Sequence, residues 1–258
     1  MTFGLCAGPE LAQDAKNAGF TFLEGGVGGV LKPTCSEAEF EDAFVQYAQA
    51  VLPTTNLNCL LPGGMSIAGP QADIPKAVAY CTTAIQRAGR SGIETICFGS
   101  GGARKCPEGW SFPEAERQIR EFLKALAPVA QASGIVITIE DLNKTETNTL
   151  CTVGETAAMA RSVGSPAVCI LIDGYHWAKD ADSAADIVAS ASLIKHTHIA
   201  TIPSRFAPGE EPCDFAPFAH ALSKAGYKGK MAVEAKINDK SPEGLCKIIK
   251  TLKASFNL

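Results

Sequence analysis

The chain has 258 residues, of which 46% are hydrophobic and 19% charged, and its formal net charge at pH 7 is −4. This composition is typical of a well-packed globular protein and excludes a disordered chain. The acidic balance, without any long basic run, argues against a nucleic-acid partner, because phosphate binding draws on clustered Lys and Arg. No stretch approaches the ~20 apolar residues of a membrane-spanning helix, so we expect no membrane partner.

Short apolar runs alternate with amphipathic runs along the whole chain. The apolar runs predict eight strands, at residues 3–6, 20–23, 57–61, 94–98, 135–139, 168–172, 194–199 and 230–233. The amphipathic runs predict helices at residues 10–17, 36–51, 74–88, 112–132, 153–163, 183–191, 215–225 and 243–254. A capping-box pattern, Ser36 followed three residues later by Glu39, marks the start of the second helix.

The regular alternation of strand and helix predicts parallel strands joined by right-handed crossovers. Eight such units predict a closed (β/α)₈ TIM barrel of the α/β class. No change of composition marks a linker, so we predict a single domain over residues 1–258. Barrels of this kind commonly use about 200–250 residues as one domain.

Four of the predicted strands end in groups that bind hard metal ions. Glu140, Asp173, His198 and Glu234 close the fifth, sixth, seventh and eighth strands. A lone acidic residue at a strand end is usually a helix cap or a solvated loop residue. In a parallel barrel, however, all these ends open on one face, where active sites lie. Three carboxylates and one imidazole suit Mn²⁺ or Mg²⁺ better than a thiolate-preferring metal, with zinc or cobalt as alternatives.

Other polar side chains follow the same strand ends. Glu146, His176 and Arg205 lie on the loops of the predicted catalytic face, where they could hold hydroxyls or an anionic group. Glu146 could instead cap the helix that follows it. His196 precedes His198 by two residues and therefore faces the same side of its strand, so we expect it to form a hydrogen bond inside the barrel.

The segments IEDLNKTETN, LIDGYH, HTHIA and VEAK together resemble the motifs of one known family. This is the xylose-isomerase-like (β/α)₈ superfamily of sugar isomerases and epimerases. The chain looks most similar to the branch that contains ketose 3-epimerases, such as D-tagatose 3-epimerase, and hydroxypyruvate isomerase-like proteins. The resemblance covers most of the chain and is strongest from residue 94 onward.

The resemblance implies one divalent metal ion, held by the four strand-end residues, with Mn²⁺ as the first expectation and Mg²⁺ or Co²⁺ as alternatives. It implies that Glu140 and Glu234 also act as an acid–base pair on opposite faces of a bound sugar. It further implies that Glu146, His176 and Arg205 bind this substrate, and that the chain could form a homodimer or homotetramer.

The expected activity is therefore a metal-dependent isomerase or epimerase acting on a sugar or a sugar phosphate. Removing a proton beside a carbonyl leaves negative charge on oxygen, and a divalent ion stabilises the resulting cis-enediolate. Return of the proton from the opposite side inverts a ketose at C3, whereas return to the neighbouring carbon interconverts aldose and ketose. The GSGGAR segment could cradle a phosphate with its backbone N–H groups or could simply allow a tight loop.

Three alternative functions stay open at this point. A dehydratase or lyase on a related barrel, similar to inosose or dehydroshikimate dehydratase, would use the same metal ligands. A hydrolase resembling apurinic endonucleases would need a three-zinc cluster rich in histidine, and this chain has only four histidines. A non-catalytic sugar-binding barrel is the third alternative.

The ten cysteines include no CxxC pair, and several lie in apolar, strand-like runs. We therefore predict free structural thiols, with a disulfide or a reactive thiol as the alternative. The first residues, MTFGLCAGPE, lack the basic region and apolar core of a signal peptide. These features predict a cytoplasmic protein in a reducing environment.

Overall fold

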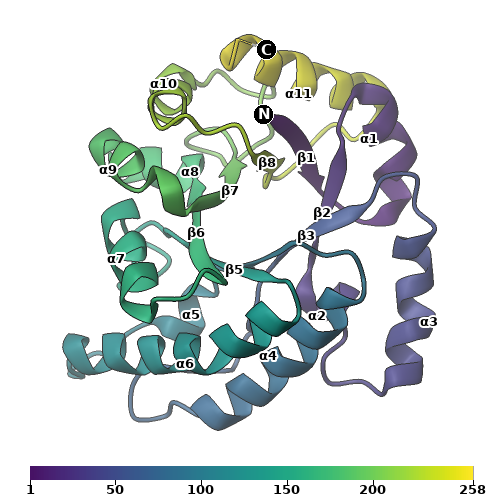
Figure 1. Cartoon of the computed structure of the whole chain (residues 1–258). Coiled ribbons are helices and arrows are strands. Elements are labelled where there is room, and N and C mark those ends of the chain that lie inside the picture. Colours follow the sequence, from purple (N-terminus) through teal and green to yellow (C-terminus); the bar gives the residue numbers. More distant parts are fainter. Residues whose placement is uncertain (258) are drawn as a thin grey trace.

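The computed structural model describes residues 1–257, and within them eight parallel strands close into one barrel. Each strand pairs with the next in the chain and β8 pairs with β1 (Figure 1). The strands are β1 Thr2–Cys6, β2 Phe22–Gly26, β3 Thr54–Asn58, β4 Thr95–Phe98, β5 Val136–Glu140, β6 Val168–Asp173, β7 Ile194–Ile199 and β8 Lys230–Val233. The predicted (β/α)₈ TIM barrel is therefore confirmed.

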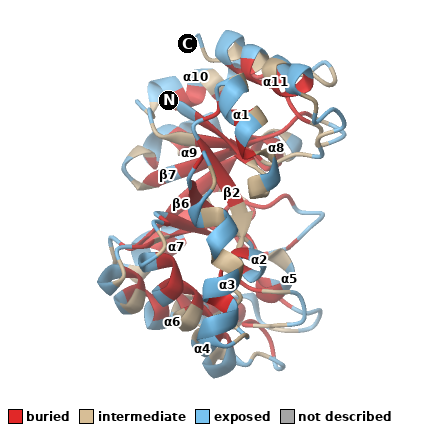
Figure 2. Cartoon of the chain, turned by 90° about the vertical axis from the view of Figure 1, so that its right-hand side faces the viewer, coloured by how far each residue is buried: buried red, intermediate tan, exposed pale blue. Residues whose placement is uncertain are grey.

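Helices surround the barrel and separate its strands from solvent. The longer ones are α1 Ala12–Ala18, α3 Glu37–Ala48, α4 Ile74–Gly89, α6 Phe112–Ala132, α7 Val153–Val163, α10 Ala216–Lys224 and α11 Pro242–Ser255. The shorter ones are α2 Val27–Val30, α5 Gly101–Arg104, α8 Gly174–Lys179, α9 Ala184–Ala189 and the 3₁₀ turns Pro9–Leu11 and Ala191–Leu193. Figure 2 shows the buried strands at the centre and the exposed helical faces around them.

The third strand is the clearest correction to the predicted elements. It spans Thr54–Asn58, not residues 57–61, although its sequence TTNLN is mostly polar. The side chains of Asn56 and Thr95 meet inside the barrel, where the Asn56 amide donates to the Thr95 hydroxyl at 2.5 Å. Because the buried polar groups bond to one another, this strand needs no apolar run, and the predicted strand was displaced by three residues.

The helix ends follow local signals more closely than the third strand does. Ser36 and Glu39 form the predicted capping box at the start of α3. That helix ends at Ala48, earlier than the predicted residue 51, and Leu52 then turns into the core. The predicted helix 183–191 is a shorter α9 followed by a 3₁₀ turn, and the predicted loop after β4 contains the short helix α5.

The barrel interior contains both apolar and polar side chains beneath the mouth. Gly4 of β1 leaves room for the Phe22 ring, since a Cβ on Gly4 would lie 2.2 Å from a ring carbon. Phe22 lies edge-on to His196 with ring centroids 6.0 Å apart. Glu24 follows Phe22 by two residues and points to the same side of β2, one layer nearer the mouth. The Phe22 ring, whose centroid is also 5.1 Å from Nζ of Lys230, thus lies one layer below Glu24.

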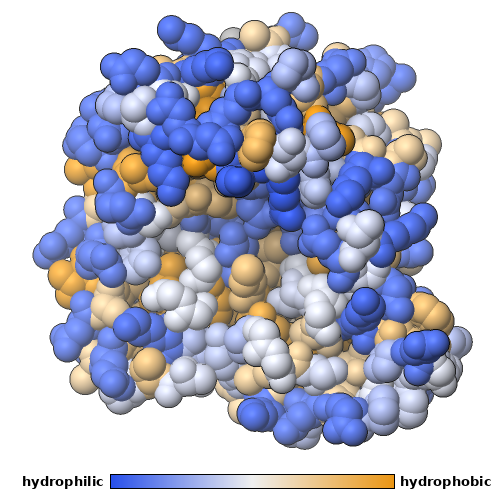
Figure 3. All heavy atoms as spheres, turned by 180° about the vertical axis from the view of Figure 1, so that it is seen from behind, coloured by the Kyte–Doolittle hydropathy of each residue, from blue (hydrophilic) through white to orange (hydrophobic). Residues whose placement is uncertain are grey.

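All ten cysteines are free, as predicted. Among residues 1–257 no helix has both the length and the apolar character needed to cross a bilayer. On the face shown in Figure 3, hydrophilic residues gather along the upper part and hydrophobic ones form separate small patches.

Candidate metal and substrate site

The fold brings the four strand-end residues together at the carboxyl mouth of the barrel. Glu140 and Asp173 are the last residues of β5 and β6, His198 is the last but one of β7, and Glu234 follows β8 directly. One ligand atom from each lies within 4.8 Å of the others. We call these four residues the mouth cluster. Asp173 and His198 are also register partners in the β6–β7 ladder, which places their side chains next to each other.

The imidazole of His198 lies between carboxylates on both of its sides. Its Nδ1 atom is 3.1 Å from Oε1 of Glu140 and 3.7 Å from Oε2 of Glu234. Its Nε2 atom is 2.9 Å from Oε1 of Glu24. Burial alone would lower the pKa of His198, but the three carboxylates outweigh burial and raise the pKa well above its usual value. The carboxylates therefore favour the positively charged form of this imidazole.

Glu24 is a site residue that the sequence analysis missed. It is 1% exposed, and its Oε2 atom accepts a hydrogen bond from Nε2 of His196 at 2.7 Å while Oε1 contacts His198. Burial raises the pKa of Glu24, but the charges and hydrogen bonds of His198 and His196 outweigh burial. The pKa of Glu24 is therefore lowered, which favours the ionised carboxylate. The expected hydrogen bond of His196 inside the barrel is thus present. Glu24 directly follows the apolar run predicted at residues 20–23, although β2 continues to Gly26, and this signal could have identified it.

Glu140 is fixed by three neighbours on β4 and its following loop. The Cys97 thiol donates to Oε2 of Glu140 at 3.2 Å, and Nη2 of Arg104 donates to the Glu140 backbone carbonyl at 2.7 Å. A Cβ on Gly99 would lie 2.1 Å from Oε2, so only glycine leaves room for this carboxylate. Burial raises the pKa of Glu140, but the hydrogen bond and charge of His198 outweigh it and bring the pKa to about 2.

Glu234 has the opposite electrostatic character. Its Oε1 atom accepts a hydrogen bond from the Asn58 amide at 3.2 Å, and its Oε2 atom is ion-paired with Arg205. Burial, with Glu140 and Asp173 nearby, raises the pKa of Glu234 to about 7 against the lowering effect of His198 and Arg205. Two carboxylates whose pKa values are driven apart are typical of acid–base pairs. Asn58 is the last residue of β3, at the mouth of the barrel. The sequence analysis missed it because the predicted strand at residues 57–61 placed Asn58 near the start of the strand.

Arg205 lies over the mouth cluster. Its guanidinium is ion-paired with Glu234, lies 3.4 Å from carboxylate oxygens of Glu146 and Asp173, and stacks 4.9 Å from the centroid of the Tyr175 ring. The backbone of Arg205 has a φ of 55°, a left-handed conformation that non-glycine residues seldom adopt. The structure thus brings Arg205 and Glu146 to the mouth. Thr152, not Glu146, caps the following helix α7.

The third predicted substrate residue, His176, has a defined tautomer. The Oδ1 atom of Asn143 accepts the backbone N–H of Thr145 at 3.1 Å, so the amide nitrogen of Asn143 must point the other way. That nitrogen is 2.6 Å from Nδ1 of His176. An amide nitrogen only donates, so Nδ1 accepts and Nε2 carries the ring proton in the neutral imidazole. Nε2 lies 3.3 Å from Oδ2 of Asp173, which directs a donor toward the mouth cluster.

A cavity of about 280 Å³ opens beside the mouth cluster, at the ends of β1, β2 and β3. Its lining is small or polar and contains no Lys or Arg: Cys6, Ala7, Gly8, Glu24, Gly25, Gly26, Tyr47 and Asn58. Asn58 and Glu24 each contact the mouth cluster, so the cavity and the cluster share one wall. A small polar molecule could therefore extend from one into the other.

The loop after β4 is built for packing. Arg104 is fully buried. Its guanidinium donates a hydrogen bond to the backbone carbonyl of Glu140 and lies 5.6 Å from the centroid of the Phe98 ring. Ser100 accepts the Leu61 backbone N–H at 3.0 Å and thereby ties the loop to the segment after β3. The GSGGAR segment thus forms a tight loop whose arginine points inward. This is the second of the two alternatives derived from its glycines.

The donor set of the mouth cluster fits a hard divalent cation. Glu140 and Asp173 are 4% and 1% exposed, and buried carboxylates need compensating charge. When the site holds no metal, the positively charged form of His198 supplies part of this charge. Three carboxylates and one imidazole are ligands that Mn²⁺ and Mg²⁺ accept.

Comparisons with known proteins identify the family of this chain. A family model described as xylose isomerase-like TIM barrel matches residues 12–254. Among curated proteins, one from Streptomyces coelicolor, provisionally named hydroxypyruvate isomerase, is 27% identical over 239 residues, which cover 87% of this chain and 84% of that protein. An L-ribulose 3-epimerase from Mesorhizobium japonicum is 29% identical over 126 residues, or 48% of this chain and 42% of that protein.

Solved structures extend the likeness to the whole fold. A D-psicose 3-epimerase crystallised in the presence of D-fructose superimposes with a TM-score of 0.83, covers 100% of both chains and is 19% identical. At this identity the superposition shows the shared fold alone.

Proposed function

Because this chain belongs to the xylose isomerase-like TIM barrel family, we propose that it is a divalent-metal-dependent sugar isomerase or epimerase. The observation that carries the proposal is the mouth cluster, in which Glu140 and Glu234 flank His198 and have strongly different pKa values. Curated relatives that carry the names hydroxypyruvate isomerase and L-ribulose 3-epimerase support an isomerase-type reaction.

The proposed metal ligands are Glu140, Asp173, His198 and Glu234, with Mn²⁺ as the first candidate and Mg²⁺ or Co²⁺ as alternatives. When bound, the divalent ion would act as a Lewis acid that stabilises negative charge on substrate oxygens. His198 would offer Nδ1, which faces Glu140 and Glu234, while Glu24 holds the proton on Nε2. A carboxylate on the far nitrogen of a metal-binding histidine fixes the ring orientation and raises its basicity.

Proton transfer is the proposed task of the two glutamates. One carboxylate removes a proton from the carbon beside the substrate carbonyl and leaves an enediolate. The other glutamate, in its protonated carboxylic acid form, then donates its proton, either to the same carbon, which inverts it, or to its neighbour, which moves the carbonyl. Glu234, with its pKa raised to about 7, is suited to exchange a proton at neutral pH.

The remaining residues would hold the sugar. The Nε2–H group of His176 and the guanidinium of Arg205 point donors at the mouth, and Glu146 adds an acceptor beside Arg205. These donors and acceptors match the hydroxyl and carbonyl groups of a sugar.

An unphosphorylated sugar fits the charges better than a sugar phosphate. Arg205 is already paired with three carboxylates, Arg104 is fully buried, and the adjoining cavity has no Lys or Arg in its lining. A phosphate beside Arg205 would therefore compete with carboxylates that are already ion-paired with this arginine. The ten free thiols are in keeping with our proposal of a reducing, cytoplasmic environment.

The test is a screen of free and phosphorylated ketoses and aldoses with added Mn²⁺ in deuterated water. We expect deuterium to enter a carbon-bound position of a free sugar, together with an epimer or an isomer as product. A dehydratase would instead release an unsaturated product. The absence of both exchange and turnover with every sugar and metal tested would contradict the proposal.

A further inference from the structure

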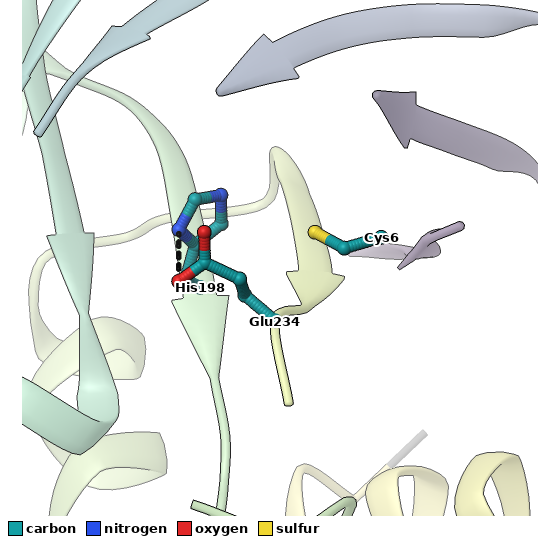
Figure 4. Close-up of side chains that lie close together, drawn as sticks. All are labelled: Cys6, His198 and Glu234. Carbon is teal, nitrogen blue, oxygen red and sulfur yellow. Dashed lines mark ion pairs between the residues drawn. The ribbon is translucent and has the colours of Figure 1, made fainter. Parts of the chain in front are cut away.

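A second set of metal-binding side chains shares two members with the mouth cluster. The Sγ atom of Cys6, a ring nitrogen of His198 and a carboxylate oxygen of Glu234 all lie within 4.8 Å of one another. Cys6 ends β1, His198 lies near the end of β7 and Glu234 follows β8, so the three come from adjacent strands of the closed barrel. Figure 4 shows the Cys6 sulfur directed toward the ion-paired His198 and Glu234.

From this arrangement we propose that Cys6, His198 and Glu234 form a binding site for a thiophilic divalent cation such as Zn²⁺ or Cd²⁺, which overlaps the hard-metal site at His198 and Glu234. A thiolate donor selects soft or borderline cations, whereas the mouth cluster offers oxygen in its place. Zn–S and Zn–N bonds of about 2.3 and 2.1 Å place tetrahedral ligand atoms ~3.5 Å apart. Side-chain shifts of about 1 Å would close the present spacing to that value.

Access to the site is open. Cys6 is half-buried and lines the 280 Å³ cavity at the ends of β1–β3, so an ion can reach its sulfur from the mouth. Three protein ligands leave a coordination position for water, as in many zinc sites. Binding releases to solvent the Cys6 thiol proton and the proton of the His198 nitrogen that joins the ion, and it leaves the thiolate on the metal.

The overlap has a functional consequence. Both metal sites require His198 and Glu234, so one copy of the chain cannot fill both at once. A thiophilic ion on Cys6 would also take Glu234 away from proton transfer. Zn²⁺ or Cd²⁺ would therefore displace the hard metal and inhibit the proposed reaction. The binding inference itself does not depend on that reaction.

Cadmium titration of the metal-free, full-length protein tests the site, because Cd²⁺–thiolate bonds absorb in the ultraviolet. We expect one equivalent of Cd²⁺ to produce this charge-transfer band, and Cys6→Ser to remove it and weaken Cd²⁺ binding at least tenfold. The matched control is Cys59→Ser, which removes an exposed thiol beside Asn58 and should leave the band unchanged. An undiminished band in Cys6→Ser would overturn the inference.

Two further measurements separate this site from the proposed function. Glu140→Gln should keep the Cd²⁺ band while losing Mn²⁺ affinity, because Glu140 belongs only to the mouth cluster. Cys6→Ser should keep Mn²⁺ affinity within about twofold. In the unmodified protein, Cd²⁺ should release bound Mn²⁺ one for one, read from the electron paramagnetic resonance of free Mn²⁺. If both ions bind together, the proposed overlap is wrong; if Mn²⁺ never binds but the Cys6-dependent band forms, only the proposed function fails.

Discussion

The Nε2 atom of His198 lies 2.9 Å from Oε1 of Glu24, on the side of the imidazole opposite the nitrogen that faces Glu140. Glu24 comes from β2 and His198 from β7, so the contact crosses the inside of the barrel. Glu24 also accepts a hydrogen bond from His196 and is therefore held by two imidazoles. This contact links the proposed metal site to the polar layer beneath it.

Replacing Glu24 should weaken metal binding without removing a ligand. In Glu24→Gln the amide can accept a hydrogen bond from only one imidazole, so His198 loses the anion that orients it. We expect Mn²⁺ affinity, measured by titration calorimetry, to fall roughly 10–100-fold. Glu41→Gln, an exposed acidic residue on α3, serves as the control. Unchanged affinity in Glu24→Gln would mean that the contact is only structural.

The two proposed proton carriers should be needed separately. Glu140→Gln and Glu234→Gln each remove one carboxylate while preserving its size, and we expect kcat to fall by about 10²–10⁴-fold for each. Assays at Mn²⁺ concentrations that saturate each variant separate lost chemistry from lost metal. An unchanged kcat for product formation in a metal-loaded variant would exclude that residue as a proton carrier.

Metal should stabilise the fold through the mouth cluster. At a Mn²⁺ concentration 100 times Kd, binding contributes about 2.7 kcal/mol. For a domain of this size this corresponds to a rise in Tm of roughly 5–10 °C. Glu140→Gln should remove most of the rise, and a chelator should reverse it in the unmodified protein. A Tm that does not respond to millimolar Mn²⁺ would contradict the assignment of the ligands.

The tautomer of His176 should depend on Asn143. Asn143→Asp replaces the donor that faces Nδ1 with an acceptor, so the ring proton should move from Nε2 to Nδ1. The ring ¹⁵N chemical shifts report this move directly. We expect KM for the sugar to rise about tenfold, the cost of losing one hydrogen bond of roughly 1.4 kcal/mol.

Asn148→Asp makes the same chemical change in the same loop, where the side chain contacts the Cys106 backbone instead of His176. It should leave the ring shifts of His176 unchanged. Identical His176 spectra in Asn143→Asp and the unmodified protein would show that Asn143 does not set the tautomer.

Alkaline pH should destabilise the protein partly through Tyr227. Burial raises the pKa of Tyr227, whose hydroxyl donates to the Lys230 carbonyl at 2.6 Å. The folded protein keeps a proton that the unfolded chain loses above pH about 10. This contribution is complete below that pH and is lost as the pH rises, by about 1.4 kcal/mol per pH unit.

In Tyr227→Phe the free energy of unfolding should fall less steeply with pH above about 10, because one titrating group is missing. At pH 7 the variant should be less stable by about 1 kcal/mol because it lacks the hydrogen bond. Urea unfolding between pH 7 and 11 measures both quantities. Burial also raises the pKa of thiols such as Cys81, so both proteins lose stability at alkaline pH for this second reason. The difference between their free energies of unfolding at each pH therefore reports Tyr227 alone. Parallel stability curves for the two proteins would exclude this role.

Much of this molecule could be predicted from local signals. Strand and helix periods identified the barrel, and Ser36 and Glu39 marked a helix start that the structure contains. The rule that parallel strands open on one face selected four residues that the fold brings within 4.8 Å. Their role as metal ligands stays a prediction.

Contacts across the barrel could not be predicted in this way. β2 is not a neighbour of β7, so nothing in the local sequence relates Glu24 to His198. Asn58 was missed because β3 is polar, and the partners of its Asn56 and Asn58 amides are side chains that other strands bring into the barrel.

The sequence alone therefore determined the fold and the strand ends that carry the mouth cluster. Hydrophobic periodicity, helix caps and turn residues are local properties that can be read from a single segment. Only the tertiary structure decided which side chains meet inside the mouth: Glu24 on His198, Asn143 on His176 and Cys6 beside Glu234. These contacts depend on barrel closure, on the stagger of its strands and on side-chain direction, none of which a single segment specifies.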